Sequence, residues 1–231
     1  MTGVLQATVE QRSWLKDAYL YIRSYDKEYS KIMNWPTSIK LTTIKPSGTL
    51  SLLAGVTPGV HPTPAGPFYI RRIRMATNSP LLSVCKSHGY SIEPQFNFDG
   101  SEDKGTMVVS FPCKLPKTTP VAADYSWKEQ LEMVRQMQAE WSDNSVSCTV
   151  YYKKEDLEDI KQYLKENYST NFKTLSFLLY FGHGFKQAPY ETITEEQYVE
   201  LIKNTTPITS VDVQETDFNV EECGTGACPI K

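Results

Sequence analysis

The sequence lacks several features that would place it at once in a class of proteins. It has no apolar run near the roughly eighteen residues of a membrane span, and no apolar segment typical of a signal peptide. Its net charge is only −3, which argues against a nucleic-acid-binding surface because such surfaces carry a basic excess or stripe. No internal repeat is visible. We therefore expect neither a membrane protein nor a nucleic-acid-binding protein.

Cysteine and histidine are also scarce. The five cysteines are odd in number and widely spaced, which argues against a disulfide framework and predicts a reducing, cytoplasmic compartment. Of the three histidines, His183 lies between two glycines, but no second histidine or carboxylate stands at ligand spacing. The sequence therefore predicts no metal site.

The rest is a globular composition, with 40 % hydrophobic residues in 231, enough for one large or two small domains. Strand and helix signals alternate along the chain, which predicts an α/β fold of parallel βα units. Helices are expected over 1–34, 78–88, 126–141, 153–167 and 194–204, and strands over 38–44, 68–75, 106–111, 146–152 and 174–179. Capping boxes are expected at Ser126 with Glu129 and at Thr194 with Gln197, and Gly89 is expected to end the helix before it. Residues 55–67 and 92–104 are expected to be irregular.

Three groups of side chains have both a structural and a functional interpretation. The aromatic stripe of the first helix, with Tyr19, Tyr25 and Tyr29, could form core or stack on bases. His61 could be satisfied by loop carbonyls or could contact a ligand. The arginines of strand 68–75 could be paired structurally or could clamp phosphate. In each case the structural interpretation is favoured.

A small hydroxyl-rich loop follows the strand expected at 38–44. Pro46 restricts Lys45 to extended backbone and ends the strand, and Gly48 lets the chain turn with no Cβ in the way of a ligand. Ser47, Thr49 and Ser51 supply hydroxyls and helix-capping groups. Backbone amides at such a helix start can bind an anion, although an ordinary capped turn explains the same residues.

The end of the chain predicts a flexible tail, because the apolar period fades from residue 208 onward. Within this tail, Cys223 and Cys228 are separated by four residues, two of them glycine, so the pair can close a small ring. A zinc site would need two more ligands. In a reducing compartment the pair fits thiol–disulfide exchange, with two exposed structural cysteines as the alternative.

Residues 39–74 of this sequence, with Lys45-Pro46-Ser47-Gly48-Thr49, resemble the adenosylcobalamin-dependent (class II) ribonucleoside-triphosphate reductases. The run 182–190 is similar to that family as well. The resemblance implies that residues 1–207 are the C-terminal portion of a ten-stranded α/β barrel and that 208–231 form its redox-active tail. It also implies that Pro46, Ser47, Gly48, Thr49 and Ser51 hold the phosphate of a ribonucleoside triphosphate substrate.

The resemblance further implies a mechanism and its partners. In the family, adenosylcobalamin generates a thiyl radical that removes the ribose 3′ hydrogen, the 2′ hydroxyl leaves, and a cysteine pair supplies the electrons. Cys223 and Cys228 match the C-terminal pair that restores those thiols and is itself reduced by thioredoxin. The product would be a deoxyribonucleotide for DNA replication.

One part of the family pattern is missing. No Asn-x-Cys-x-Glu pattern occurs, so none of Cys85, Cys113 and Cys148 is assigned the radical role. We therefore expect an N-terminal portion of the reductase as a partner, either separately encoded or joined to this chain, because a partial barrel leaves strand edges to be covered. The alternative is a non-catalytic nucleotide-binding or regulatory remnant. Co-purification with a second polypeptide favours the first hypothesis, and a stable solitary monomer the second.

Overall fold

The computed structural model describes residues 1–47, 50–97, 99–117, 119–180 and 186–211. These residues divide into two compact units. The first unit takes the described residues within Met1–Pro64 and Thr118–Phe181, and the second takes those within Ala65–Lys117 and Gly182–Lys231. Each unit therefore combines two stretches of chain, and each is described by itself below.

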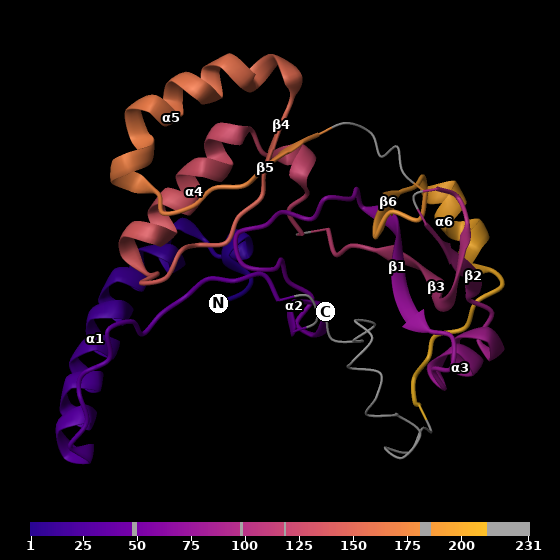
Figure 1. Cartoon of the computed structure of the whole chain (residues 1–231), viewed down its shortest axis with the longest axis horizontal. Coiled ribbons are helices and arrows are strands. Elements are labelled where there is room, and N and C mark those ends of the chain that lie inside the picture. Colours follow the sequence, from indigo (N-terminus) through magenta and orange to yellow (C-terminus); the bar gives the residue numbers. More distant parts are fainter. Residues whose placement is uncertain (48–49, 98, 118, 181–185, 212–231) are drawn as a thin grey trace. The chain divides into compact units, whose positions relative to one another are not determined.

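The first unit contains the long helix α1 and a layer of helices beside a small sheet (Figure 1). Its elements are α1 (Val9–Met33), α2 (Leu50–Leu53), α4 (Trp127–Glu140), α5 (Leu157–Asn171), β4 (Val150–Tyr152) and β5 (Phe177–Leu179), with 3₁₀ turns at Val4–Gln6, Ala122–Asp124 and Lys154–Asp156. Strands β4 and β5 pair in parallel. The parallel arrangement expected from the sequence is thus confirmed in this unit.

Helix α4 supplies more buried residues to the core of the first unit than any other element, namely Trp127, Leu131, Val134 and Met137. It begins at a capping box in which Ser126 and Glu129 satisfy each other's backbone amides, as the sequence predicts. Leu131 and Met137 on its inner face are fully buried and pack with Val146 and Ile160. This apolar layer joins α4 to α5 and β4, and it supports the segment that leads to the hydroxyl-rich loop.

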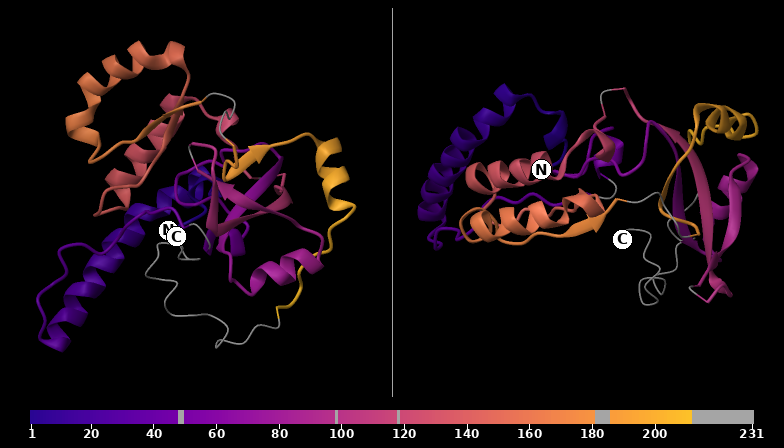
Figure 2. Two further views of the ribbon diagram at one scale, coloured as in Figure 1. Left: turned by 45° about the vertical axis from the view of Figure 1, so that its right-hand side comes forward. Right: turned by 90° about the horizontal axis from the view of Figure 1, so that it is seen from above.

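The second unit is a four-stranded sheet with two helices against it (Figures 1 and 2). Its elements are β1 (Phe68–Ala76), α3 (Leu81–Ser87), β2 (Ser91–Phe96), β3 (Glu102–Lys114), β6 (Tyr190–Thr192) and α6 (Glu195–Ile202). The strand order is β2-β3-β1-β6, and every pairing is antiparallel. Val108 and Val109 of the central strand β3 are fully buried.

A glycine sets the end of α3 in the second unit. Gly89 has φ +80°, and a Cβ at this position would overlap the carbonyl oxygen of Asn204 just after α6. The amide of Thr206 donates to the carbonyl of His88 at 2.9 Å. The predicted stop at Gly89 is therefore confirmed, and the glycine allows the ends of α3 and α6 to approach closely.

Three predictions about strands were wrong. Residues 38–44 form no regular strand, residues 92–104 include most of β2 and the start of β3, and the sheet of the second unit is antiparallel. The second and third errors come from the turn between β2 and β3, where the amide of Asn97 donates to the carbonyl of Ser101 at 2.8 Å. A hairpin joins only antiparallel strands, and a hydrophobic pattern alone does not reveal strand direction.

The prediction that the aromatic stripe of the first helix is core was also wrong for much of its length. Leu15 and Tyr19 are half-buried, but Trp14, Tyr25 and Ile32 are 57, 58 and 78 % exposed. Only Ser30 of α1 is buried. The helix therefore covers the first unit with one narrow face.

The described strands form a four-stranded and a two-stranded sheet, and neither closes into a barrel. Within the described part of the chain, no helix combines the length and the apolar character needed to cross a membrane.

Candidate functional site

The hydroxyl-rich loop begins at Pro46 and ends in α2. The amide of Ser51 donates to the hydroxyl of Ser47 at 3.0 Å, and the Ser51 hydroxyl donates back to the Ser47 carbonyl at 2.5 Å. Ser51 is 1 % exposed, whereas Ser47 is half-buried. Gly48 and Thr49 lie outside the described residues. Ser51 therefore closes the loop from within.

The residues just before this loop are anchored in the core of the first unit. Ile44 is fully buried in the cluster around α4. Gly59, with φ +59°, lets the following chain pack on it, since a Cβ there would lie 3.1 Å from Ile44 Cγ2. On the other side, the amide of Ser147 donates to the Ile44 carbonyl at 3.1 Å. The base of the loop is thus held from two directions.

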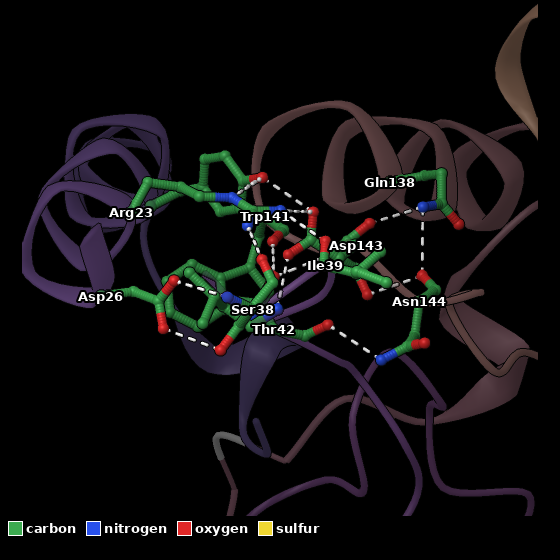
Figure 3. Close-up of polar contacts among 12 residues, drawn as sticks. Arg23, Asp26, Ser38, Ile39, Thr42, Gln138, Trp141, Asp143 and Asn144 are labelled. Atoms are coloured by element: carbon green, nitrogen blue, oxygen red, sulfur yellow. Dashed lines mark hydrogen bonds and ion pairs between the residues drawn. The ribbon is translucent and has the colours of Figure 1, made fainter. Parts of the chain in front are cut away.

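Thr42 ties the same segment to the residues after α4. Its hydroxyl donates to the carbonyl of Trp141 and accepts from the amide of Asp143 at 3.1 Å. Its carbonyl accepts from both the backbone and the side-chain amide of Asn144, each at 3.3 Å (Figure 3). Thr42 is 4 % exposed, so these bonds satisfy polar groups that water does not reach.

Asp143 is the centre of a polar network that joins α1 to this segment (Figure 3). Its carboxylate accepts from the Tyr19 hydroxyl at 2.7 Å and from the Leu41 amide at 2.8 Å, and it forms an ion pair with Arg23 at 3.1 Å. Burial raises the pKa of Asp143, but the Leu41 and Tyr19 hydrogen bonds and the Arg23 charge outweigh it, so the pKa lies below its ordinary value.

A second set of contacts continues the network along α1. Arg23 donates to the carbonyls of Ser38 and Ile39 at 2.7 and 2.9 Å. Asp26 accepts from the amide and the hydroxyl of Ser38 at 2.9 and 2.7 Å. We call Arg23, Asp26 and Asp143 the α1 clamp. It fixes the path of residues 38–42, which lead directly to the loop.

Comparison with known proteins identifies the family of this chain. A family model described as the barrel domain of ribonucleotide reductase matches residues 38–178. The chain belongs to the ribonucleotide reductase barrel-domain family. The match begins at the segment held by the α1 clamp and includes the hydroxyl-rich loop.

Similar proteins point to the class II branch of this family. The adenosylcobalamin-dependent ribonucleoside-triphosphate reductase of Euglena gracilis is 40 % identical over 199 residues, which are 84 % of this chain and 26 % of that protein. The Lactobacillus gasseri enzyme of the same name is 35 % identical over 92 % of this chain and 29 % of its own length. The chain thus spans less than a third of these relatives.

A solved structure supports the same assignment. The crystal structure of a B-12-dependent (class II) ribonucleotide reductase superposes with a TM-score of 0.72 at 32 % identity, covering 87 % of this chain and 28 % of that one. The chain is therefore a partial homologue of adenosylcobalamin-dependent class II reductases.

The other side chains singled out in this barrel-domain sequence have structural partners. His61 Nδ1 lies 3.2 Å from the Pro58 carbonyl, and burial lowers its pKa, so the histidine is neutral and satisfied within its loop. In the second unit, Arg71, Arg72 and Arg74 donate to three successive carbonyls, those of residues 189, 188 and 187. These arginines hold the chain before β6, as the structural interpretation predicts.

The cysteines divide into two groups. Burial raises the pKa of Cys85, Cys113 and Cys148, which favours the thiol over the reactive thiolate. This environment gives no support for a radical or nucleophilic role. Cys223 and Cys228, predicted as the thiol shuttle, lie outside the described residues, as does His183.

The first unit also contains a polar pocket of about 470 Å³ between the ends of α4 and α5. Its cations are already paired, because Arg135 forms an ion pair with Glu132 at 2.5 Å and Lys173 donates to the Asp143 carbonyl. No group of three or more metal-ligating side chains occurs among the residues that the structure describes. Glu140, which also lines the pocket, accepts from the neutral Gln136 side chain at 3.0 Å. The pocket therefore combines charges of both signs and presents no cluster of cations to an anionic ligand.

Sequence reasoning missed the α1 clamp. Arg23 and Asp143 are 120 residues apart, and neither stands in a motif. The only local signal is the polar run that follows α4. This contact forms only because α1 packs near α4, and the hydrophobic period of a helix does not reveal which other helix it contacts.

Replacing Asp143 with alanine should lower the free energy of unfolding by about 2 kcal/mol, because it leaves the Leu41 amide and the Tyr19 hydroxyl without their acceptor. Since the folded pKa of Asp143 lies below its ordinary value of about 4, the carboxylate stabilises fully above that value. This stabilisation is lost as the pH falls through the folded pKa. Urea unfolding from about pH 7 to about pH 3 measures both effects.

The control for this variant is Asp159→Ala, which removes an exposed carboxylate of α5. It should change stability by no more than about 0.5 kcal/mol. If the Asp143 variant unfolded with the wild-type profile at every pH, the α1 clamp would contribute nothing to stability.

Proposed function

We propose that this chain is the C-terminal portion of an adenosylcobalamin-dependent reductase that converts ribonucleoside triphosphates to deoxyribonucleoside triphosphates. The main support is that the family match covers a loop with Ser47, Gly48 and Ser51 whose base is fixed by Ile44, Thr42 and the α1 clamp. A loop whose base is fixed in this way loses less conformational entropy when it binds a substrate.

In this proposal the loop with Pro46, Ser47, Gly48, Thr49 and Ser51 forms the binding site for the substrate phosphate. Ser47 is the half-buried hydroxyl of the loop, whereas Ser51 uses both its amide and its hydroxyl on Ser47. Ser51 therefore positions Ser47, and the direct contacts fall to Ser47 and to the backbone around Gly48. Glycine at that position allows phosphate oxygens to approach the chain closely.

Cys223 and Cys228 are proposed as the thiol shuttle, carried by a flexible tail over residues 208–231 behind a barrel portion of residues 1–207. When this dithiol reduces a disulfide in the active site, it loses two electrons and two protons and itself becomes a disulfide. Thioredoxin, a dithiol donor, would then return both. Such exchange needs the reducing conditions of the cytoplasm.

The relatives are named for adenosylcobalamin, the cofactor that supplies a radical when bound. The pocket at the ends of α4 and α5 does not fit it, since about 470 Å³ is too small for a corrin ring with its appendages. We therefore derive no step through the cofactor on this chain. Its binding and the radical cysteine are assigned to the remaining reductase sequence.

The same remaining sequence would complete the barrel. Residues 42–44 lie beside 144–147, and β4 pairs in parallel with β5, so the first unit holds a short series of parallel extended segments. A ten-stranded barrel would continue from the edges of this series, because unpaired edges need a partner. The N-terminal portion of the reductase is accordingly the proposed partner.

The test is a reconstitution. The 231-residue chain with adenosylcobalamin, a ribonucleoside triphosphate and a dithiol should form no deoxyribonucleotide, whereas adding the N-terminal portion should start turnover. Deoxyribonucleotide formation by the chain alone would contradict the dependence on a partner. Nucleotide binding without turnover in the combined sample would favour a regulatory remnant.

A further inference from the structure

Helix α1 carries an exposed apolar stripe along most of its length. We call it the outer stripe; its members are Trp14, Tyr21, Tyr25, Tyr29 and Ile32, which are 57, 72, 58, 45 and 78 % exposed. At 1.5 Å per residue the outer stripe is about 27 Å long. Contiguous apolar surface on this scale is typical of an interaction site.

The outer stripe is distinct from the face that attaches α1 to the first unit. That inner face consists of Leu15, Tyr19, Arg23, Asp26 and Ser30, which are half-buried or buried. At 3.6 residues per turn, the two faces are about one third of the helix circumference apart. The α1 clamp therefore fixes the helix through its inner face, and the outer stripe stays exposed among the residues that the structure describes.

The aromatic rings of the outer stripe are ordered against one another. Tyr25 and Tyr29 are stacked with ring centroids 6.1 Å apart, and Tyr29 meets the edge of Trp35 at 6.4 Å. Tyrosine and tryptophan are the residues that most often dominate interface energies, partly because their side chains lose little entropy on binding. The stripe is thus organised before any partner arrives.

A row of carboxylates borders the outer stripe on one side. Glu10, Asp17 and Glu28 fall within about 20° of one another around the helix and are all exposed. None of the three forms an ion pair within the described residues. A matching partner therefore has an apolar groove with lysine or arginine along one rim.

We infer that the outer stripe docks into such a groove on the reductase sequence that supplies the rest of the family length, which rests on the proposed function. Most of the length of the Euglena and Lactobacillus relatives lies outside the region matched by this chain. The stripe also lies on the helix whose inner face clamps residues 38–42, where the barrel-domain match begins. The docked sequence would therefore hold the base of the hydroxyl-rich loop through α1.

A second copy of this chain is a poorer occupant. If two copies packed antiparallel through their outer stripes, the same border of each stripe would lie on the same side of the interface. The row of Glu10, Asp17 and Glu28 would then meet the same row of the other copy. Like charges placed together oppose association. This arrangement remains a distinct outcome of the test below.

The test compares two double variants of the 231-residue chain. Tyr21→Ser with Tyr25→Ser removes two members of the outer stripe, and Lys16→Ser with Lys27→Ser changes two exposed residues on the opposite side of α1. Binding to the N-terminal portion of the reductase, produced as a separate polypeptide, is measured by calorimetry, and circular dichroism checks that each variant is folded. The tyrosine variant should bind at least about tenfold more weakly, and the lysine variant should match the wild type.

Each outcome separates the inference from the proposed function. Wild-type affinity in a folded tyrosine variant would overturn the docking inference and leave the proposed function standing. Failure of the wild-type chain to bind the N-terminal polypeptide would overturn both. Self-association that the tyrosine variant abolishes, with partner binding unchanged, would assign the stripe to a second copy and also overturn the inference.

Discussion

Replacing Cys223 and Cys228 with serine should lower thioredoxin-driven turnover of the reconstituted reductase by at least about 100-fold. Serine keeps the size of the side chain but cannot form a disulfide, so electrons no longer pass from thioredoxin to the active site. A single turnover by pre-reduced enzyme should survive, because that event draws only on thiols already present. Rapid-quench assays of deoxyribonucleotide formation separate the two regimes.

Two comparisons sharpen this result. The single variants Cys223→Ser and Cys228→Ser should each lose as much activity as the double variant, since a disulfide needs both thiols. Cys113→Ser, at a half-buried thiol whose pKa is raised by burial, should keep the thioredoxin-driven rate. Unchanged rates in the double variant would refute the shuttle role.

Replacing Ser47 with aspartate should raise the KM for the ribonucleoside triphosphate by roughly 100-fold. A carboxylate about 4 Å from a phosphate in partly desolvated surroundings adds repulsion of several kcal/mol, and each 1.4 kcal/mol is about tenfold. Aspartate is also a good helix N-cap, so it can still accept the hydrogen bond from the Ser51 amide. The change therefore isolates charge from loop structure.

Ser47→Asn is the matched control, because asparagine caps the helix equally well and carries no charge. Its KM should rise by no more than about tenfold, in line with the loss of one hydrogen bond. Steady-state rates over a range of substrate concentrations give both values. An aspartate variant with the KM of the asparagine variant would place the substrate phosphate away from Ser47.

Local chemistry explains which parts of the fold could be predicted. The capping boxes at Ser126 and Thr194 and the glycine stop at Gly89 lie where the sequence indicates, since each depends on residues within one turn. The amphipathic period likewise indicates α4 and α5 within a few residues. These features need no knowledge of distant contacts.

Strand direction could not be predicted in the same way. β3 was expected to be a strand, and it is one, but its partners β1 and β2 run antiparallel to it. An apolar strand between two neighbours has the same pattern whether those neighbours are parallel or antiparallel. The hairpin turn at 97–101 decided the direction, and its polar residues also fit a longer loop.

In the candidate site, too, the sequence revealed the local features and missed the long-range contacts. Pro46, Ser47 and Ser51 were identified from local residue types, and the structure joins Ser47 to Ser51 by two hydrogen bonds. The α1 clamp was not identified, because Arg23 and Asp143 meet only after α1 packs near α4. The exposure of Tyr25 had the same cause, since an amphipathic period shows that a residue is apolar and not which neighbour covers it.

The sequence by itself determined the family, the helices with their caps, and the loop of small hydroxyl residues, because each is written in neighbouring residues. Only the tertiary structure decided that the second unit is antiparallel and that Asp143 ties α1 to the base of the loop. The physical reason is that strand pairing, burial and ion pairs depend on groups far apart in the chain, whose meeting is set by packing.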